Sequence, residues 1–199
     1  MKKSIFLFVL IVLLGTSLFA NGIVGKGVKL GFNFAKIDGN DVEINFDSKL
    51  GFIIGGFAIF QMTDMIFIQP ELFYTMKGAK DDGEGYVSTI SLNYLELPVL
   101  AKFNIPIEGN LTPNLFFGPA LGINLSSTHK VEYDDYDDVS DDLEDIKGME
   151  FGLIFGGGIN INKICIDARY NLGLSSIDDS SDSEDVKNRV FSILLGYMF

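Results

Sequence analysis

The sequence predicts an all-β protein: an eight-stranded antiparallel β-barrel of the kind that spans a membrane with its strands. Three observations predict it. An apolar run opens the chain, apolar side chains alternate with polar or small ones through most of the remainder, and acidic residues gather in every second connection. The 199 residues are enough for one domain. Hydrophobic residues make up 47% of the chain although its net charge is -12, so apolar and charged residues must be segregated.

The composition excludes several classes of protein. With a pI near 4.4 the chain lacks the basic face that phosphate binding needs, so no nucleic-acid partner is expected. One Cys and one His exclude a disulfide scaffold and a zinc ribbon. No cofactor is expected.

The N-terminal segment has the order of parts found in a secretory signal peptide. Lys2 and Lys3 precede an apolar or small run from Ile5 to Ala20, and polar sequence follows. We therefore expect cleavage after residues 1–20, which leaves residues 21–199 as an outer-membrane β-barrel domain. An uncleaved membrane anchor is the alternative, but the run is shorter than the roughly 20 residues that a spanning helix needs.

Period-two alternation predicts the strands, because successive side chains of a strand point to opposite faces. It is clearest in residues 164–174, where the even positions are apolar and the odd positions are polar or small. The eight expected strands lie near residues 26–35, 49–61, 65–78, 88–104, 113–126, 149–161, 163–175 and 188–199.

Some segments follow this alternation less regularly. Residues 50–60 and 151–161 are Gly-rich and apolar on both faces. Within 88–104 the upstream apolar residues, such as Tyr94, are even-numbered, whereas those from Leu95 onward are odd-numbered. We therefore expect a β-bulge near Tyr94 and Leu95.

The connections alternate between long and short. Segments 36–48, 79–86, 127–147 and 176–189 are expected to be loops and hold most of the 27 acidic residues, while the intervening connections are short. Long loops outside the cell and tight turns on the periplasmic side are typical of outer-membrane barrels. We expect a monomer in the cell outer membrane, with both termini at the periplasmic end.

The polar face distinguishes a membrane barrel from a soluble ligand-binding barrel. It is dominated by Gly, Ala, Asn and a few nearly balanced charges, and an eight-stranded barrel is just wide enough for side chains to fill it. We expect the apolar face to contact outer-membrane lipid, with ordinary surface charges as the alternative. The polar network expected in the lumen consists of Lys29, Glu71, Lys77, Glu96, Lys102, Asp167 and Arg169.

Four segments carry a resemblance to a known family: IQPELFYTMKGAK (68–80), NYLELPVLAKF (93–103), NLFFGPALGINLS (114–126) and ARYNLGLSSI (168–177). Together they resemble the PorT-type outer-membrane β-barrel family common in Bacteroidetes-like bacteria, over nearly all of the chain that follows the signal peptide. The resemblance implies an outer-membrane barrel of about eight strands. It does not imply the secretion role of the founding member, because a fold does not define a function. The matching polar positions are Glu71, Glu96, Lys102 and Arg169.

His129 is the one residue that suggests catalysis. It is the only His of the chain and lies in the acidic segment 127–147. A His base oriented by a carboxylate would suit hydrolysis, whereas a solvated loop His is the simpler interpretation.

The acidic segments also offer oxygen ligands of the type that Ca²⁺ prefers. The EF-hand pattern is not matched, and a hydrated, self-repelling loop is the alternative. The candidate ligands in the two segments are Asp134, Asp135, Asp137, Asp138, Asp141, Asp142, Asp178, Asp179 and Asp182.

The expected function is therefore that of a non-enzymatic outer-membrane barrel with long acidic extracellular loops and a structural or surface-interaction role. A porin-like channel for small solutes is a second hypothesis, disfavoured because the charged side chains should fill so narrow a lumen. An outer-membrane hydrolase that uses His129 is the third.

Overall fold

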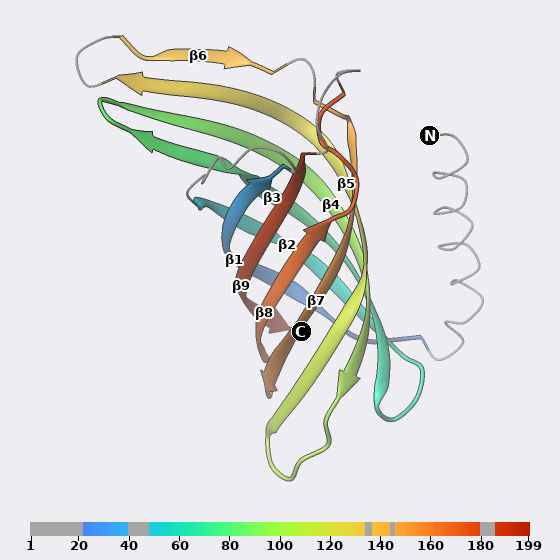
Figure 1. Ribbon diagram of the computed structural model, residues 1–199. Coiled ribbons are helices and arrows are strands. Elements are labelled where there is room, and N and C mark those ends of the chain that lie inside the picture. The colour runs from blue at the N-terminus through green and yellow to red at the C-terminus, as the bar shows by residue number, and fades with distance from the viewer. Residues whose placement is uncertain (1–21, 40–47, 134–136, 144–145, 180–185) are drawn as a thin grey trace.

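The structure, a computed structural model, describes residues 22–39, 48–133, 137–143, 146–179 and 186–199 (Figure 1). The expected signal peptide and its cleavage site lie outside the described residues. Within these ranges no helix is long and apolar enough to cross a membrane.

The described residues form nine β-strands. They are β1 (Ile23–Asp38), β2 (Lys49–Gln61), β3 (Ile66–Gly83), β4 (Tyr86–Asn104), β5 (Leu111–Tyr133), β6 (Val139–Asp142), β7 (Met149–Ile161), β8 (Ile164–Gly173) and β9 (Lys187–Met198). Each of the eight predicted segments corresponds to one strand of this set, including the two Gly-rich segments. The short strand β6 was not predicted.

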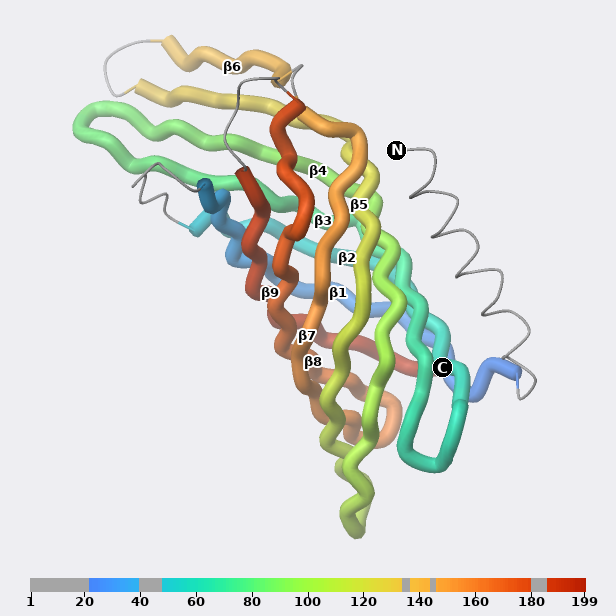
Figure 2. Tube along the Cα trace, turned by 45° about the vertical axis from the view of Figure 1, so that its right-hand side comes forward, coloured from blue at the N-terminus to red at the C-terminus, as the bar shows by residue number. Residues whose placement is uncertain are grey.

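Eight of these strands close into an antiparallel ring. The sheet order is β4-β3-β2-β1-β9-β8-β7-β5, and pairing of β4 with β5 closes it, while β6 pairs with β5 outside the ring (Figures 1 and 2). Closure matters in a membrane because an unpaired backbone amide in hydrocarbon costs about 2 to 7 kcal/mol. The predicted fold class, an eight-stranded barrel, is confirmed.

The two faces of the barrel have opposite chemistry. Outward positions such as Leu30, Phe32 and Leu195 are large, apolar and about half exposed, whereas inward neighbours such as Lys29 and Asn33 are buried. A water-soluble protein has the reverse arrangement, while a membrane barrel presents an apolar band to lipid. The inner face is not purely polar, however, because aromatic and aliphatic side chains also fill the lumen.

A register shift between Asn93 and Tyr94 confirms the bulge predicted near Tyr94 and Leu95, but the extra residue does not lie in β4. Tyr94 lies fully buried on the inner face, and the inward alternation runs through β4 without a break. Across the strand pair, Asn93 lies opposite Ser126 whereas Tyr94 lies opposite Asn124. The extra residue is therefore Leu125, and it belongs to β5. An even-numbered apolar run in β4 faces inward because apolar residues are also needed to fill the lumen.

Two of the predicted loops are largely strand. The β3–β4 hairpin extends to a two-residue turn between Gly83 and Tyr86, where Gly85 adopts a φ of 83° that favours glycine. β5 continues to Tyr133, and β6 adds a further strand. Residues 78–91, 127–133 and 139–142 thus form a four-stranded sheet, here called the arm, which projects from the barrel end that carries the long connections (Figure 1).

Candidate functional site

Four of the predicted lumen residues form one buried ion-pair cluster. Arg169 Nη1 donates to Glu71 Oε2 at 2.6 Å, and Lys29 Nζ donates to Glu71 Oε1 at 2.9 Å and to Asp167 Oδ2 at 2.6 Å. The inner rows of β1, β3 and β8 bring these side chains together. Two cations face two carboxylates, so the Coulomb attraction offsets the cost of removing each charge from water.

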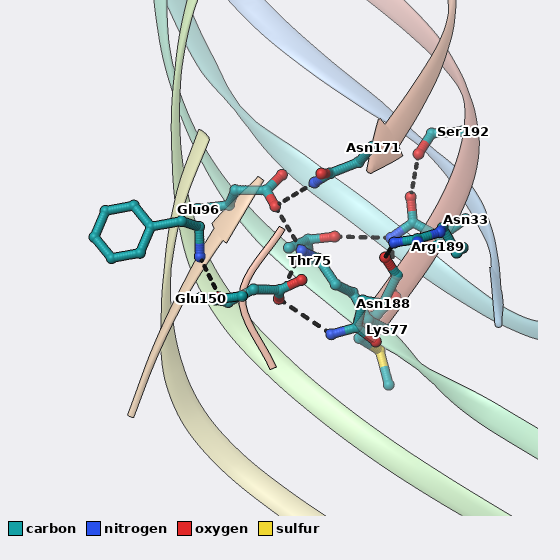
Figure 3. A network of polar contacts seen from close by, with 12 residues as sticks. Asn33, Thr75, Lys77, Glu96, Glu150, Asn171, Asn188, Arg189 and Ser192 are labelled. Carbon is teal, nitrogen blue, oxygen red and sulfur yellow. Dashed lines mark hydrogen bonds and ion pairs between the residues drawn. The ribbon is translucent and has the colours of Figure 1, made fainter. Parts of the chain in front are cut away.

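A second cluster lies around Lys77, nearer to the arm. Lys77 Nζ donates to Glu96 Oε1 at 2.7 Å and to Glu150 Oε2 at 3.2 Å. Figure 3 shows amides that donate to the same carboxylates: Asn171 Nδ2 reaches Glu96 Oε1 at 2.7 Å, and Asn188 Nδ2 reaches Glu150 Oε2 at 3.1 Å. One ammonium and two amides thus share two carboxylates.

Aromatic rings surround these buried cations. The guanidinium carbon of Arg169 lies 5.4 Å from the ring centroid of Phe73 and 5.5 Å from that of Phe116. Lys77 Nζ lies 4.9 Å from the ring centroid of Tyr94. Cation–π contacts of this kind gain strength where water is excluded. The lumen at this level is filled by paired charges packed between rings.

Glu150 is a carboxylate of the lumen network that was not predicted. It stands just before the Gly-rich segment of β7, whose two apolar faces hid the phase of the strand. The even positions of β7, including Gly152 and Ile154, point inward, so parity alone would have placed Glu150 in the lumen.

Lys102 differs from the other six predicted network residues. Its side chain is only 3% exposed, yet within the described residues it makes no hydrogen bond and no ion pair. It lines a cavity at the end of the barrel that carries the short turns.

An apolar cluster packs at the opposite end of the lumen, and we call it the mouth cluster. Its buried members are Leu92, Tyr94 and Ile177, and Ile37, Ile90, Ile146 and Val186 pack against them. Backbone bonds hold the segments in place: Ile177 N donates to Val186 O, and Lys147 N donates to Ile177 O, both at 2.8 Å. The cluster was not predicted. The sequence feature that could have indicated it is the presence of isolated apolar residues, such as Ile146, Ile177 and Val186, within acidic segments.

The arm carries exposed aromatic rings and surface ion pairs. Tyr86 and Tyr133 lie opposite one another in neighbouring strands. Tyr86 Oη donates to Asp81 Oδ2 at 3.2 Å, and the charge of Asp81 raises the pKa of Tyr86 above its ordinary 10.0. Lys130 Nζ lies 2.7 Å from Glu132 Oε1, and this bond contributes to a raised pKa of Lys130. Outside the barrel, therefore, the sheet presents rings and carboxylates to solvent.

His129 lies in strand β5 of the arm, and its placement in a loop was wrong. Its Nε2 lies 2.9 Å from Ser88 Oγ on the neighbouring strand β4. On its other side it is opposite Asp141 of β6 in the strand register. Within the described residues, however, no hydrogen bond joins the ring of His129 to a carboxylate.

The acidic candidates for Ca²⁺ are only partly described. Asp134, Asp135 and Asp182 lie outside the described residues. Of the others, Asp138 pairs with Lys130 at 3.0 Å, and Asp141 and Asp142 belong to β6. In the described part of the chain no three metal-ligating side chains converge. Calcium binding stays a prediction.

A closed antiparallel ring with an apolar exterior and a charged, filled interior defines an outer-membrane β-barrel. The sequence agrees, since residues 20–179 match the family model described as outer membrane protein beta-barrel domain. The chain belongs to this family and is an outer-membrane protein. Comparison with curated proteins finds no match.

Three solved structures match this chain at low sequence identity. Neisserial surface protein A is 15% identical, and the alignment covers 89% of this chain and 99% of that one with a TM-score of 0.52. The attachment invasion locus protein of Yersinia pestis is 15% identical over 88% of this chain and 98% of that one, with a TM-score of 0.45. The N-terminal barrel of Pseudomonas aeruginosa OprF is 10% identical, and the alignment covers 89% of this chain and 100% of that one with a TM-score of 0.41.

Proposed function

We propose that the protein is a monomeric, non-enzymatic surface barrel whose arm contacts molecules outside the cell. The observation that carries this proposal is the continuation of β3, β4 and β5 beyond the barrel, where β6 joins them in an ordered sheet. The charged side chains in the middle of the lumen, by contrast, form ion pairs with one another. The sequence segments quoted above support membership of the PorT-type branch as part of the same proposal.

The surface of the arm has the chemistry of a contact surface. Tyr86 is 37% exposed, Tyr133 41% and Val139 48%, and carboxylates such as Asp81 flank them. Tyrosines are enriched at protein interfaces because the ring gives contact area and the hydroxyl gives a hydrogen bond. β6 is also an edge strand, paired with β5 alone among the described strands, and edge strands accept further pairing.

The channel hypothesis fits the structure less well. Arg169 and Glu71 join opposite walls of the lumen, and the mouth cluster packs apolar side chains at the end beside the arm. An ion entering from outside would have to displace apolar side chains and then separate buried ion pairs, and both steps are costly.

One observation favours the hydrolase as a second candidate. The Ser88–His129 contact of 2.9 Å is a nucleophile–base geometry, and Asp141 lies across the strand from His129. A fluorophosphonate probe should label Ser88 if the pair is active, and the label should disappear in Ser88→Ala. Absence of labelling in the wild type removes this candidate.

Cell adherence tests the surface-interaction role. Bacteria that display the chain should adhere to an epithelial cell layer more than cells without it, and the double variant Tyr86→Ser/Tyr133→Ser should lose most of the gain. Tyr197→Ser is the matched control, because Tyr197 is similarly exposed but lies at the periplasmic end of the barrel. Equal adherence with and without the displayed chain would overturn the proposal.

A further inference from the structure

A cavity of about 260 Å³ lies at the periplasmic end of the lumen, away from the arm and the mouth cluster. Its wall is built where strands β2, β3, β4, β7 and β9 end or begin. The side chains of Ile59, Phe67 and Met198 make it apolar, and those of Lys102, Asn104 and Asn160 give it polar groups.

Lys102 provides this cavity with an unpaired positive charge. Lys102 is only 3% exposed, but no described residue accepts a hydrogen bond from its ammonium group. The nearby carboxylates of Asp167 and Glu71 both pair with Lys29 and with Arg169, and neither pairs with Lys102, although Asp167 Oδ1 accepts no hydrogen bond. A buried ammonium without an acceptor carries a desolvation cost that an anionic ligand would offset.

The two asparagines provide unpaired acceptors beside the charge. The Oδ1 atoms of Asn104 and Asn160 are buried and have no donor. Buried side-chain oxygens are normally hydrogen-bonded, so a molecule in the cavity can supply the donor that each of these oxygens lacks. The cavity therefore combines an excess cation, two excess acceptors and an apolar wall.

We propose that this cavity binds a small organic acid of the N-acyl amino acid type from the periplasmic side. Its carboxylate pairs with Lys102, its amide N–H donates to Asn104 or Asn160, and its apolar side chain packs on Phe67 and Met198. The cavity is slightly below the roughly 300 to 1,000 Å³ of common ligand pockets, so the ligand has about the size of one residue. This site is independent of the contact role proposed for the arm.

Calorimetric titration of the full chain, folded in detergent micelles, with N-acetyl-leucine tests the proposal. We expect saturable one-to-one binding that Lys102→Met weakens about ten- to hundredfold, because a hydrogen bond to a charged group is lost. Lys80→Met is the matched control, since Lys80 lies on the arm. The affinity of this variant for N-acetyl-leucine should equal that of the wild type. N-acetyl-leucinamide, which lacks the carboxylate, should not bind.

Two results would overturn the site. One is the absence of binding of N-acetyl-leucine by the wild type, and the other is equal affinity in Lys102→Met and the wild type. If octanoate, which has no N–H donor, binds as tightly as N-acetyl-leucine, the roles of Asn104 and Asn160 are wrong.

A second variant keeps the test decisive if Lys102→Met does not fold. The chain has no Trp, so Phe67→Trp places a single fluorophore in the cavity wall. Its emission should change saturably with N-acetyl-leucine and not with N-acetyl-leucinamide. An emission that does not respond to the acid overturns the proposal.

Discussion

Arg169 binds Glu71 through both ends of its guanidinium group, with Nη1–Oε2 at 2.6 Å and Nη2–Oε1 at 3.3 Å. The two residues belong to β8 and β3, which are not neighbours in the sheet. The bidentate pair therefore joins distant walls of the barrel, a geometry in which Arg–carboxylate bonds are strong and specific. It stabilises the shape of the lumen as well as filling it.

Glu71→Gln tests this cross-lumen pair. The change leaves Arg169 and Lys29 buried with one carboxylate fewer, and breaking a buried pair costs about 3–5 kcal/mol. Urea-dependent folding into lipid vesicles measures the loss in free energy of unfolding. Glu132→Gln is the control, because Glu132 pairs with Lys130 on the solvent-exposed arm and should change stability by about 0–1 kcal/mol. Equal losses for the two variants would refute the structural role of the lumen pair.

Ile193→Arg tests the lipid-facing surface. Ile193 is 48% exposed on the outside of β9 and lies near the middle of that strand, and Arg at a midplane position costs about 2–4 kcal/mol. Val139→Arg is matched in exposure at 48% but lies on the arm, so its effect should stay within about 0.5 kcal/mol. The same folding titration compares the two, and the assignment fails if Val139→Arg is the more costly.

Planar-bilayer recording tests whether the lumen is closed. We expect no steady conductance from the wild type, because paired side chains fill the lumen. Ile177→Ala should weaken the mouth cluster by about 2–5 kcal/mol and still give no conductance, because the Arg169–Glu71 pair remains. A steady conductance in the wild type would restore the channel hypothesis.

The titration of Tyr86 tests the geometry at the tip of the arm. Asp81 raises the pKa of Tyr86, so their hydrogen bond is fully present below the ordinary tyrosine pKa of 10.0 and is lost as the pH rises through the higher folded value. The difference in tyrosinate absorbance between wild type and Tyr86→Phe isolates this group. Asp81→Asn should lower its pKa toward 10.0, and Asp82→Asn, on the other face of β3, should not. If the pKa of Tyr86 is the same in Asp81→Asn and in the wild type, Tyr86 does not donate a hydrogen bond to Asp81.

The strands of the barrel could be predicted because lipid and lumen impose different chemistry on alternate residues. The prediction failed where both faces are apolar. Leu92 and Tyr94 are hydrophobic but point inward, so their even numbering suggested a bulge in β4. The extra residue is instead Leu125 in the neighbouring strand β5. Alternation shows which residues share a face, whereas the filling of the lumen decides what that face can hold.

The contacts between distant segments could not be predicted from the same pattern. Glu150 joins Lys77 across 73 positions of sequence, and a period-two signal carries no information about partners so far apart. Ile146, Ile177 and Val186 looked like chance apolar residues in acidic loops until the fold placed them together over the lumen. The extension of β3, β4 and β5 into the arm was hidden because its solvent-exposed residues lack the apolar rows that mark the membrane-spanning part.

The seam between β1 and β9 sets the order in which the protein can mature. β1 pairs with β9 from Gly27–Met198 to Asp38–Lys187. One edge of β1 therefore has no partner until β9 has been synthesised. Until then its backbone is open to aggregation with other chains. The ring can therefore close only after β9 has been synthesised, and deletion of a few residues of β9 should impair assembly more than a deletion of equal length in the arm.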